Sequence, residues 1–469
     1  MRNVSWAAAS FSTALVGAVV LVTAAGVGGL GGCGSSTRAS GFGEDPAAGD
    51  ASDEGVDPNF GDRGDSGTSK GPCVNLECKQ QTCSGGGTTS VTGTIYDPGG
   101  NTPLYNVIVY VPNAPVDKFT SGATCDKCGS VASGSPIATA LTNAKGEFKL
   151  DNVPVGNDIP LVIQVGRWRR QITIPKVDAC KDNPLTDKNV TRLPKNQAEG
   201  DLPLMALTTG EYDALECLFR KIGIDDKEFT TPTGGGRMHI YKGYGGGQLA
   251  GGSPSAVPLW ANAAEMKKYD MMMLSCEGDE HPEEKPQAAL DAMRDYANAG
   301  GRLFGTHYHY YWFKNGPSPL PQIATWSAPI SFSSGYSIDT TFPKGNDFAD
   351  WLVNVSASTT RGQIALTEVA NDVGTPNAAM GAQRWIYQGQ SAKYFSFNTP
   401  LNTQPDNQCG RVVFSDVHVS SGDTKGATFP TGCTTKTLTP QEKALEFLFF
   451  DLAACVQDDT KAPKPPVPK

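Results

Sequence analysis

The spacing of apolar residues changes once along this chain, near residue 200, and the change limits the folds available to it. Between Thr89 and about Pro175, short runs such as "NVIVYVP" and "GEFKLDNVPVG" alternate apolar and polar residues and are separated by turn residues. This period of two is typical of half-buried strands. Further along, short apolar runs alternate with helical stretches such as "KPQAALDAMRDYANAGG". The sequence therefore predicts a multidomain protein, a β-sandwich followed by an α/β domain on a mostly parallel sheet.

The first 33 residues have the layout of an export signal. Arg2 precedes a chargeless apolar run, which ends in small residues and Cys33. The tetrapeptide Leu30-Gly31-Gly32-Cys33 resembles the bacterial lipobox, in which the cysteine receives diacylglycerol and becomes the first residue of the mature protein. The resemblance implies a lipoprotein signal peptide over residues 1–32 and lipidation of Cys33. The alternative is an uncleaved apolar anchor with an incidental cysteine.

The segment that follows has the composition of a tether. Residues 33–72 are rich in glycine, and eight acidic residues and one arginine within 41–65 supply −7 of the net charge of −9. The rest of the chain is nearly neutral and has no basic stripe, so we expect no nucleic-acid partner. We expect a lipid anchor to hold the folded body in the cell envelope, at the outer membrane or the cell surface.

Eleven further cysteines are expected to form disulfides, because an exported chain matures in an oxidising compartment. Since eleven is odd, at least one thiol is free or pairs between chains. The spacing of Cys73, Cys78 and Cys83, and the pair Cys125 and Cys128, would also suit zinc, but no histidine lies nearby in the sequence. The remaining six are Cys180, Cys217, Cys276, Cys409, Cys433 and Cys455.

Three segments resemble those of a known family: "TPLYNVIVYVP", "ALTNAKGEFKLDNVPVG" and "IPLVIQVGRWRRQITI". Residues 89–176 resemble the carboxypeptidase regulatory-like domain, a transthyretin-like β-sandwich. The resemblance implies a non-catalytic module of a secreted protein. An insertion at 115–135 departs from the compact pattern. A cysteine-rich segment at 73–88 precedes this domain, and a connector at 177–200 follows it.

The order of "YDMMMLSCEG", a helix, "AGGRLFGTHYH", a long insert, "GRVVFSDVHVS" and a terminal helix carries a second likeness. Residues 201–457 resemble the class I glutamine amidotransferase-like fold, which is flavodoxin-like, and are nearest to its trehalose-utilisation-type members. The insert spans 314–408, and a tail rich in proline and lysine spans 458–469.

The catalytic motifs of that family are altered here. The amidotransferases carry Gly-x-Cys-x-Gly at the elbow after one strand and His-x-Glu after a later strand. This chain has Gly305-Thr306-His307-Tyr308-His309 at the elbow and Asp416-Val417-His418 after the later strand. The resemblance therefore implies a domain that is catalytically degenerate for glutamine hydrolysis.

Polar side chains gather at the predicted strand ends. In open α/β sheets, ligands bind at the carboxyl ends of the strands. Four of the five histidines lie at or just after such ends, and His239 lies elsewhere. The candidate cluster consists of Cys276, Glu277, His281, His307, His309, Asp416 and His418, of which Cys276, His307, Asp416 and His418 are the candidate catalytic residues.

Three interpretations of this cluster remain open. His307 and His309, two residues apart on a strand, would share a face and chelate a divalent metal such as zinc, with His418 as third ligand. Alternatively, a histidine activates Cys276 as a nucleophile. In the third interpretation the side chains only form hydrogen bonds within a loop-covered cleft.

Two functions follow from these features. The favoured one is an exported cell-surface lipoprotein that binds or scaffolds, with a carbohydrate or another envelope component as ligand, because the family nucleophile is absent. The other is an exported metal-assisted hydrolase or carbohydrate-modifying enzyme that uses His307, His309 and His418.

The lipobox resemblance generates a direct test. We expect a Cys33→Ser variant to lose both lipid labelling and signal cleavage at this position, because the diacylglycerol is attached to the cysteine sulfur. Metabolic labelling with a fatty acid and mass spectrometry of the mature N-terminus measure the two effects. Unchanged processing of the variant would rule out the lipoprotein hypothesis.

Overall fold

The computed structural model describes residues 72–128, 131–327, 335–419 and 423–468. The predicted signal peptide, the lipidation site at Cys33 and nearly all of the predicted tether lie outside these ranges. Lys70–Lys469 form one compact unit. None of the helices within the described ranges has the length and hydrophobicity needed to span a bilayer.

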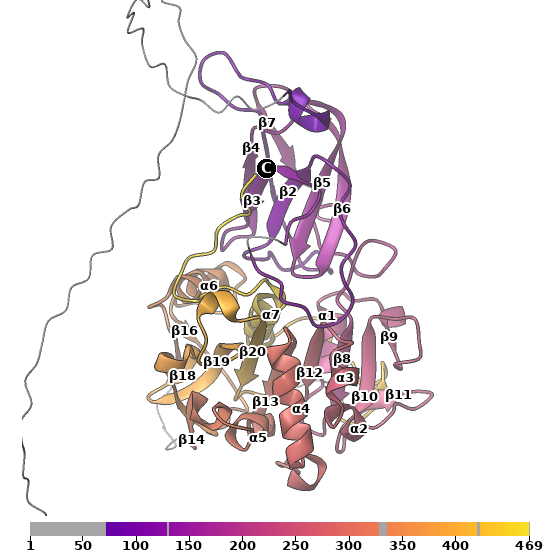
Figure 1. The fold of residues 1–469 in the computed structure, drawn as a ribbon, viewed down its shortest axis with the longest axis vertical. Coiled ribbons are helices and arrows are strands. Elements are labelled where there is room, and N and C mark those ends of the chain that lie inside the picture. The colour runs from indigo at the N-terminus through magenta and orange to yellow at the C-terminus, as the bar shows by residue number, and fades with distance from the viewer. Residues whose placement is uncertain (1–71, 129–130, 328–334, 420–422, 469) are drawn as a thin grey trace, which may run out of the picture. The chain divides into compact units, whose positions relative to one another are not determined.

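The first part of the described chain is built from two sheets, with strand orders β4-β1-β7 and β3-β2-β5-β6 (Figure 1). A short 3-10 helix, η1 (Asn75–Lys79), precedes them. In β4, Phe148 and Leu150 are buried between exposed neighbours, which is the predicted period of two. The strands are β1 (Ser90–Thr94), β2 (Ile108–Pro112), β3 (Pro136–Leu141), β4 (Glu147–Asp151), β5 (Gly156–Val165), β6 (Trp168–Val177) and β7 (Asp182–Leu185).

The second part contains a large mixed sheet, ordered β16-β15-β18-β19-β20-β13-β12-β8-β10-β9 in the described chain (Figure 1). The strands from β20 to β9 are mutually parallel. Its strands are β8 (Met205–Thr209), β9 (Phe229–Thr230), β10 (Met238–Lys242), β12 (Met271–Leu274), β13 (Arg302–Thr306), β15 (Tyr336–Ile338), β16 (Gln363–Ile364), β18 (Gln383–Gln388), β19 (Ser391–Thr399) and β20 (Gly410–Ser415).

Two strand pairs are separate from this sheet: β11 (Gln248–Leu249) with β21 (Thr428–Phe429), and β14 (Ala324–Trp326) with β17 (Val373–Pro376). The helices are α1 (Leu215–Lys221), α2 (Val257–Trp260), α3 (Ala263–Met266), α4 (Gln287–Asn298), α5 (Tyr311–Lys314), α6 (Pro343–Asn354) and α7 (Pro440–Ala453). Short 3-10 helices are η2 (Asp226–Glu228), η3 (Pro282–Glu284), η4 (His307–Tyr310), η5 (Leu320–Ile323), η6 (Ala378–Met380) and η7 (Pro405–Asn407).

The parallel strands are apolar throughout because both faces of the sheet are covered. All four residues of β12 are buried. Met271 and Met273 belong to the apolar cluster that includes α1 and α7, whereas Met272 and Leu274 belong to the cluster that includes α4 and α5. The alternation of side chains along a strand thus sends neighbours to opposite helical layers.

Helix α7 begins with a capping box. The Thr439 hydroxyl accepts the backbone N–H of Glu442 at 3.2 Å, and the Glu442 carboxylate accepts the N–H of Thr439 at 2.8 Å. Twelve of its fourteen residues are buried, as expected from apolar residues on all its sides. Its phenylalanines also contact the first part, since the ring of Phe447 stacks on Tyr105 at 5.4 Å between centroids.

The insert predicted at 314–408 is structured, and it enlarges the sheet. Its strand β19 pairs antiparallel with β20, and β18, β15 and β16 continue outward from β19. The four antiparallel strands of the large sheet therefore come from the insert. The predicted connector also contributes a strand, β7, which pairs parallel with β1.

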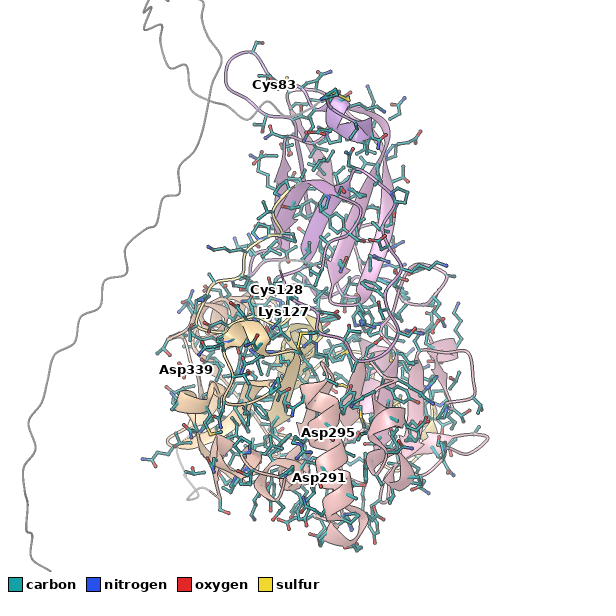
Figure 2. The ribbon with its side chains drawn as sticks, in the orientation of Figure 1. Cys83, Lys127, Cys128, Asp291, Asp295 and Asp339 are labelled. Atoms are coloured by element: carbon teal, nitrogen blue, oxygen red, sulfur yellow. A yellow bond between two sulfur atoms is a disulfide. The ribbon has the colours of Figure 1, made fainter. Side chains whose placement is uncertain are left out.

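The insertion at 115–135 ties the first part to the second. Disulfides join Cys125 to Cys409 and Cys128 to Cys455; Figure 2 labels Cys128. Next to them, the Arg167 guanidinium contacts the Asp270 carboxylate at 2.6 Å, and Asp126 at 3.3 Å. These side chains come from both parts, so the two parts pack as one body.

The other described cysteines also follow the expectation of an oxidising compartment. Disulfides link Cys73 to Cys78, Cys83 to Cys180 and Cys217 to Cys433. Cys276 is the free thiol among the described cysteines. The prediction of disulfides with one cysteine left over is therefore confirmed, and Cys125 and Cys128 each pair with a distant partner.

Removal of the Cys128–Cys455 disulfide is expected to destabilise the fold. The bond closes a loop of 327 residues, so a Cys128→Ser/Cys455→Ser variant should lose about 2–4 kcal/mol of unfolding free energy. Urea denaturation under non-reducing conditions measures it. A Cys73→Ser/Cys78→Ser variant, which opens a loop of only 5 residues, is the control and should lose less. Equal losses would contradict the loop-closure explanation.

Candidate functional site

The candidate site lies where parallel strands end side by side. Leu274 at the end of β12 pairs with Gly305 of β13, and Thr306 of β13 pairs with Ser415 at the end of β20. The segments that leave these strands therefore meet at one edge of the sheet. They carry Cys276, His307 and His418.

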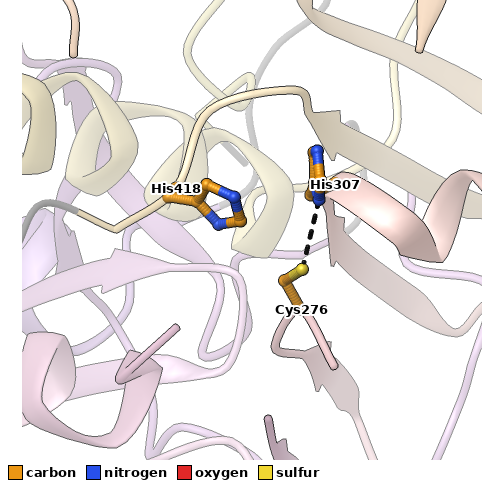
Figure 3. Close-up of side chains that lie close together, drawn as sticks. All are labelled: Cys276, His307 and His418. Carbon is orange, nitrogen blue, oxygen red and sulfur yellow. Dashed lines mark hydrogen bonds between the residues drawn. The ribbon is translucent and has the colours of Figure 1, made fainter. Parts of the chain in front are cut away.

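Cys276, His307 and His418 converge in the folded chain (Figure 3). The Cys276 Sγ lies 3.3 Å from the His307 Nδ1, and the two imidazole rings lie 4.5 Å apart between centroids. One ligand atom from each residue lies within 4.8 Å of the others, and no other set of three such residues is found in the described ranges.

The backbone turns sharply at His307. Strand β13 ends at Thr306, and His307 has a φ of 46°, in the left-handed region that a non-glycine residue rarely adopts. A 3-10 helix, η4, begins at the same residue. Gly305 makes room for this turn, because a Cβ there would lie 3.2 Å from the Cβ of His309. The chain thus folds into an elbow with a histidine at its tip.

The predicted pairing of His307 and His309 as metal ligands is not what the structure shows. The strand geometry that would align them ends at Thr306, and the 3-10 turn directs His309 into the core. The His309 Nε2 contacts the Ser275 carbonyl at 2.8 Å, and its Nδ1 accepts the indole N–H of Trp312 at 3.0 Å. Burial lowers the pKa of His309 to about 4, so the ring is neutral. Both nitrogens are engaged, and Cys276 takes the predicted place of His309.

A buried carboxylate holds His418. The Asp213 Oδ1 lies 3.1 Å from the His418 Nδ1 and accepts the backbone N–H of Val419 at 2.8 Å. The Thr306 hydroxyl donates to the other oxygen. Burial opposes ionisation of Asp213, yet its interactions with His418, Thr306 and Val419 together hold its pKa below the usual value.

A second carboxylate contacts His307. The Asp372 Oδ2 lies 3.3 Å from the His307 Nε2, on the ring edge opposite Cys276. Burial, followed by the electrostatic effect of the neighbouring His418, lowers the pKa of His307 to about 4. Burial likewise raises the pKa of Asp372. Asp372 comes from the insert, immediately before β17.

Asp416, a predicted catalytic residue, is not one of the three converging residues. It is fully buried, and its Oδ2 accepts the backbone N–H groups of Asp372 at 3.0 Å and Val373 at 3.4 Å. The Lys393 Nζ lies 3.9 Å from the same oxygen and donates to the Asn371 Oδ1 at 2.8 Å. Burial and the neighbouring Asp372 raise the pKa of Asp416 well above its usual value. Asp416 therefore holds the loop that presents Asp372 to His307.

Cys276 is a protonated thiol in this environment. Its side chain is buried, and burial together with the charge of Asp213 raises its pKa to about 12. The predicted pairing of Cys276 with an activating histidine has a counterpart in the 3.3 Å contact to the His307 Nδ1, but the raised pKa of the thiol disfavours the thiolate that a cysteine nucleophile needs.

The other members of the predicted cluster lie apart from the three converging residues. Glu277 forms a buried ion pair with Lys285 at 2.7 Å. The His281 ring stacks on Tyr244 with centroids 4.0 Å apart. His239, which was expected elsewhere, lies 3.0 Å from the Tyr269 hydroxyl through its Nδ1.

Asp213 and Asp372 were not identified from the sequence. Asp213 follows the end of β8, so the rule that selected the histidines at strand ends, applied to acidic residues, would have found it. Asp372 lies inside a long insert and has no comparable local signal.

No protein-family model matches the chain, and no curated protein matches it. Among solved structures, two type II cohesin–X-dockerin complexes from Acetivibrio cellulolyticus show a weak likeness. The C-terminal interface mutant has 16% identity over 30% of this chain and 75% of that chain, with a TM-score of 0.16. The N-terminal interface mutant has 16% identity over 29% and 85%, with a TM-score of 0.17. A 9R-lipoxygenase from Cyanothece PCC8801 has 17% identity over 26% and 18%, with a TM-score of 0.13. Likeness at this level assigns neither a fold nor a function.

Proposed function

We propose that this protein is an exported, lipid-anchored envelope protein whose α/β part binds one zinc-type metal ion through Cys276, His307 and His418. The observation that carries the proposal is the arrangement around the two imidazoles. The His418 Nδ1 is hydrogen-bonded to the Asp213 carboxylate at 3.1 Å, and the His307 Nε2 lies at ion-pair distance, 3.3 Å, from the Asp372 carboxylate. Metal-binding histidines are commonly oriented in this way, because the carboxylate fixes the ring and leaves the other nitrogen for the ion.

The donor set suits zinc. One sulfur and two imidazoles combine the soft and intermediate donors that zinc prefers. Because His307 has a pKa of about 4, its ring is already neutral, whereas Cys276 must lose a proton on binding. The bound cation would supply the positive charge that stabilises the thiolate.

Metal-assisted hydrolysis is the second candidate function. Three protein ligands leave one position of a tetrahedral ion open, and zinc lowers the pKa of a water bound there to about 7. The side chains of His307 and His418 are 14% and 13% exposed, so solvent reaches this edge of the cluster.

The envelope setting and a carbohydrate ligand belong to the same proposal. The lipobox resemblance supports the anchor, and the five disulfides among the described cysteines are compatible with export. Residues 89–176 would serve as the non-catalytic carboxypeptidase regulatory-like, transthyretin-like module. Residues 201–457 would be an amidotransferase-like domain that binds metal in place of glutamine chemistry. Tyr308 and Tyr212 have their rings 4.3 Å from His307 and 5.9 Å from His418, where they could stack on a sugar.

The purified protein is expected to bind one equivalent of zinc with an affinity that rises with pH. Because binding displaces the Cys276 proton, the affinity should rise about tenfold per pH unit below the thiol pKa of about 12. Calorimetry in buffers of different ionisation enthalpy measures the released proton. His307→Ala should abolish stoichiometric binding, and His281→Ala should not, because His281 is not one of the three converging residues. A wild-type protein that binds no zinc would refute the proposal.

Lys393→Met is expected to weaken zinc binding without touching a ligand. Lys393 and Asp416 hold the loop of Asp372, so loosening it should lower zinc affinity about 10–100-fold. The control is Lys344→Met, because Lys344 is equally buried and pairs with Asp451 at 2.7 Å. Both variants should lose stability. Equal zinc affinities in the two variants would show that Lys393 serves the fold alone.

A further inference from the structure

A separate pocket of about 160 Å³ lies on the face of the large sheet that carries α4. Its floor includes Leu303 of β13 and Val412 of β20, which are register partners on adjacent strands. Ala297 of α4 lines one side, and Trp312 and Phe313 of α5 line another. Leu303 and Val412 are buried beneath these walls.

The lining carries no uncompensated charge. Arg294 is its one charged side chain in the described structure, and it bonds to the Asp295 Oδ1 at 2.7 Å and lies 3.5 Å from Asp291; Figure 2 labels both aspartates on α4. The Thr399 hydroxyl donates to the Ala297 carbonyl at 2.8 Å. An anionic ligand would have to compete with Asp295 and Asp291 for the Arg294 guanidinium, whereas a neutral ligand needs no charged partner.

We infer that this pocket binds a neutral, compact, apolar molecule about the size of one aromatic ring. A cavity of about 150 Å³ lined by apolar side chains accommodates benzene or xenon, which matches the volume here. The walls contributed by Trp312 and Phe313 offer aromatic contact to such a ring. This site is distinct from the proposed metal centre, and its existence does not depend on it.

The pocket also shares a wall with the scaffold of the candidate metal centre. The indole of Trp312 donates to His309 at 3.0 Å, and His309 contacts the carbonyl of Ser275, the residue before Cys276, at 2.8 Å. Two hydrogen bonds, from Trp312 to His309 and from His309 to the Ser275 carbonyl, therefore connect this wall of the pocket to the segment that follows β12.

Toluene and benzoate form a matched pair of probes, because each is a single benzene ring. Toluene carries a neutral methyl group where benzoate carries a charged carboxylate. We expect toluene to bind the full-length protein in a 1:1 ratio and to raise its Tm, since a ligand of the native state stabilises it. Benzoate should bind at least tenfold more weakly. Titration calorimetry and thermal denaturation measure both. Equal affinities would overturn the inference of a neutral ligand.

Two variants of α4 locate the bound probe. Ala297→Leu fills the pocket and should abolish toluene binding, whereas Ala288→Leu makes the same change on the exposed side of the helix and should bind like wild type. Undiminished binding by Ala297→Leu would overturn the assignment. Should this variant misfold, xenon-pressurised crystals of the wild-type protein give a second measurement, in which a peak over Leu303 and Val412 is expected and no peak there would overturn the proposal. Toluene-dependent dimerisation would assign the pocket to a second copy and also overturn it.

Discussion

The Asp213 carboxylate is the interaction on which the site depends. Its two oxygens accept from the Thr306 hydroxyl at the end of β13 and from the Val419 amide after β20, and one of them contacts His418. The Cys276 amide, after β12, approaches the same carboxylate at 3.3 Å. A buried carboxylate is tolerated only when such partners surround it, so the segments leaving three strands are fixed with respect to one another.

Further buried charged residues fix the insert in the same way. Lys393 and Asp416 are fully buried, and they fix the loop from which Asp372 reaches His307. Asp213 therefore fixes one imidazole from the side of β8, and Asp372 fixes the other from the side of β17. The geometry of the cluster comes from residues that are distant in sequence, which is why the cluster can be well defined although three different loops carry it.

Local sequence patterns predicted the elements well and their long-range partners poorly. The buried strands and the gathering of Cys276, His307 and His418 at one edge of the sheet follow from apolar runs and from the positions of strand ends, which are local signals. The ligand pairing of His307 and His309 was wrong because a two-residue spacing has different meanings in a strand and in a 3-10 turn. Nothing in the spacing of the cysteines indicated partners 284 and 327 residues away.

The two long-range disulfides also impose an order on biosynthesis. Cys125 and Cys128 emerge early from the ribosome, but their partners, Cys409 and Cys455, emerge hundreds of residues later. Until then, both early thiols are open to exchange with each other and with neighbouring cysteines. A chain interrupted before residue 455 would retain an unpaired Cys128. Completion of the Cys128–Cys455 disulfide therefore requires a chain that has been synthesised at least as far as residue 455.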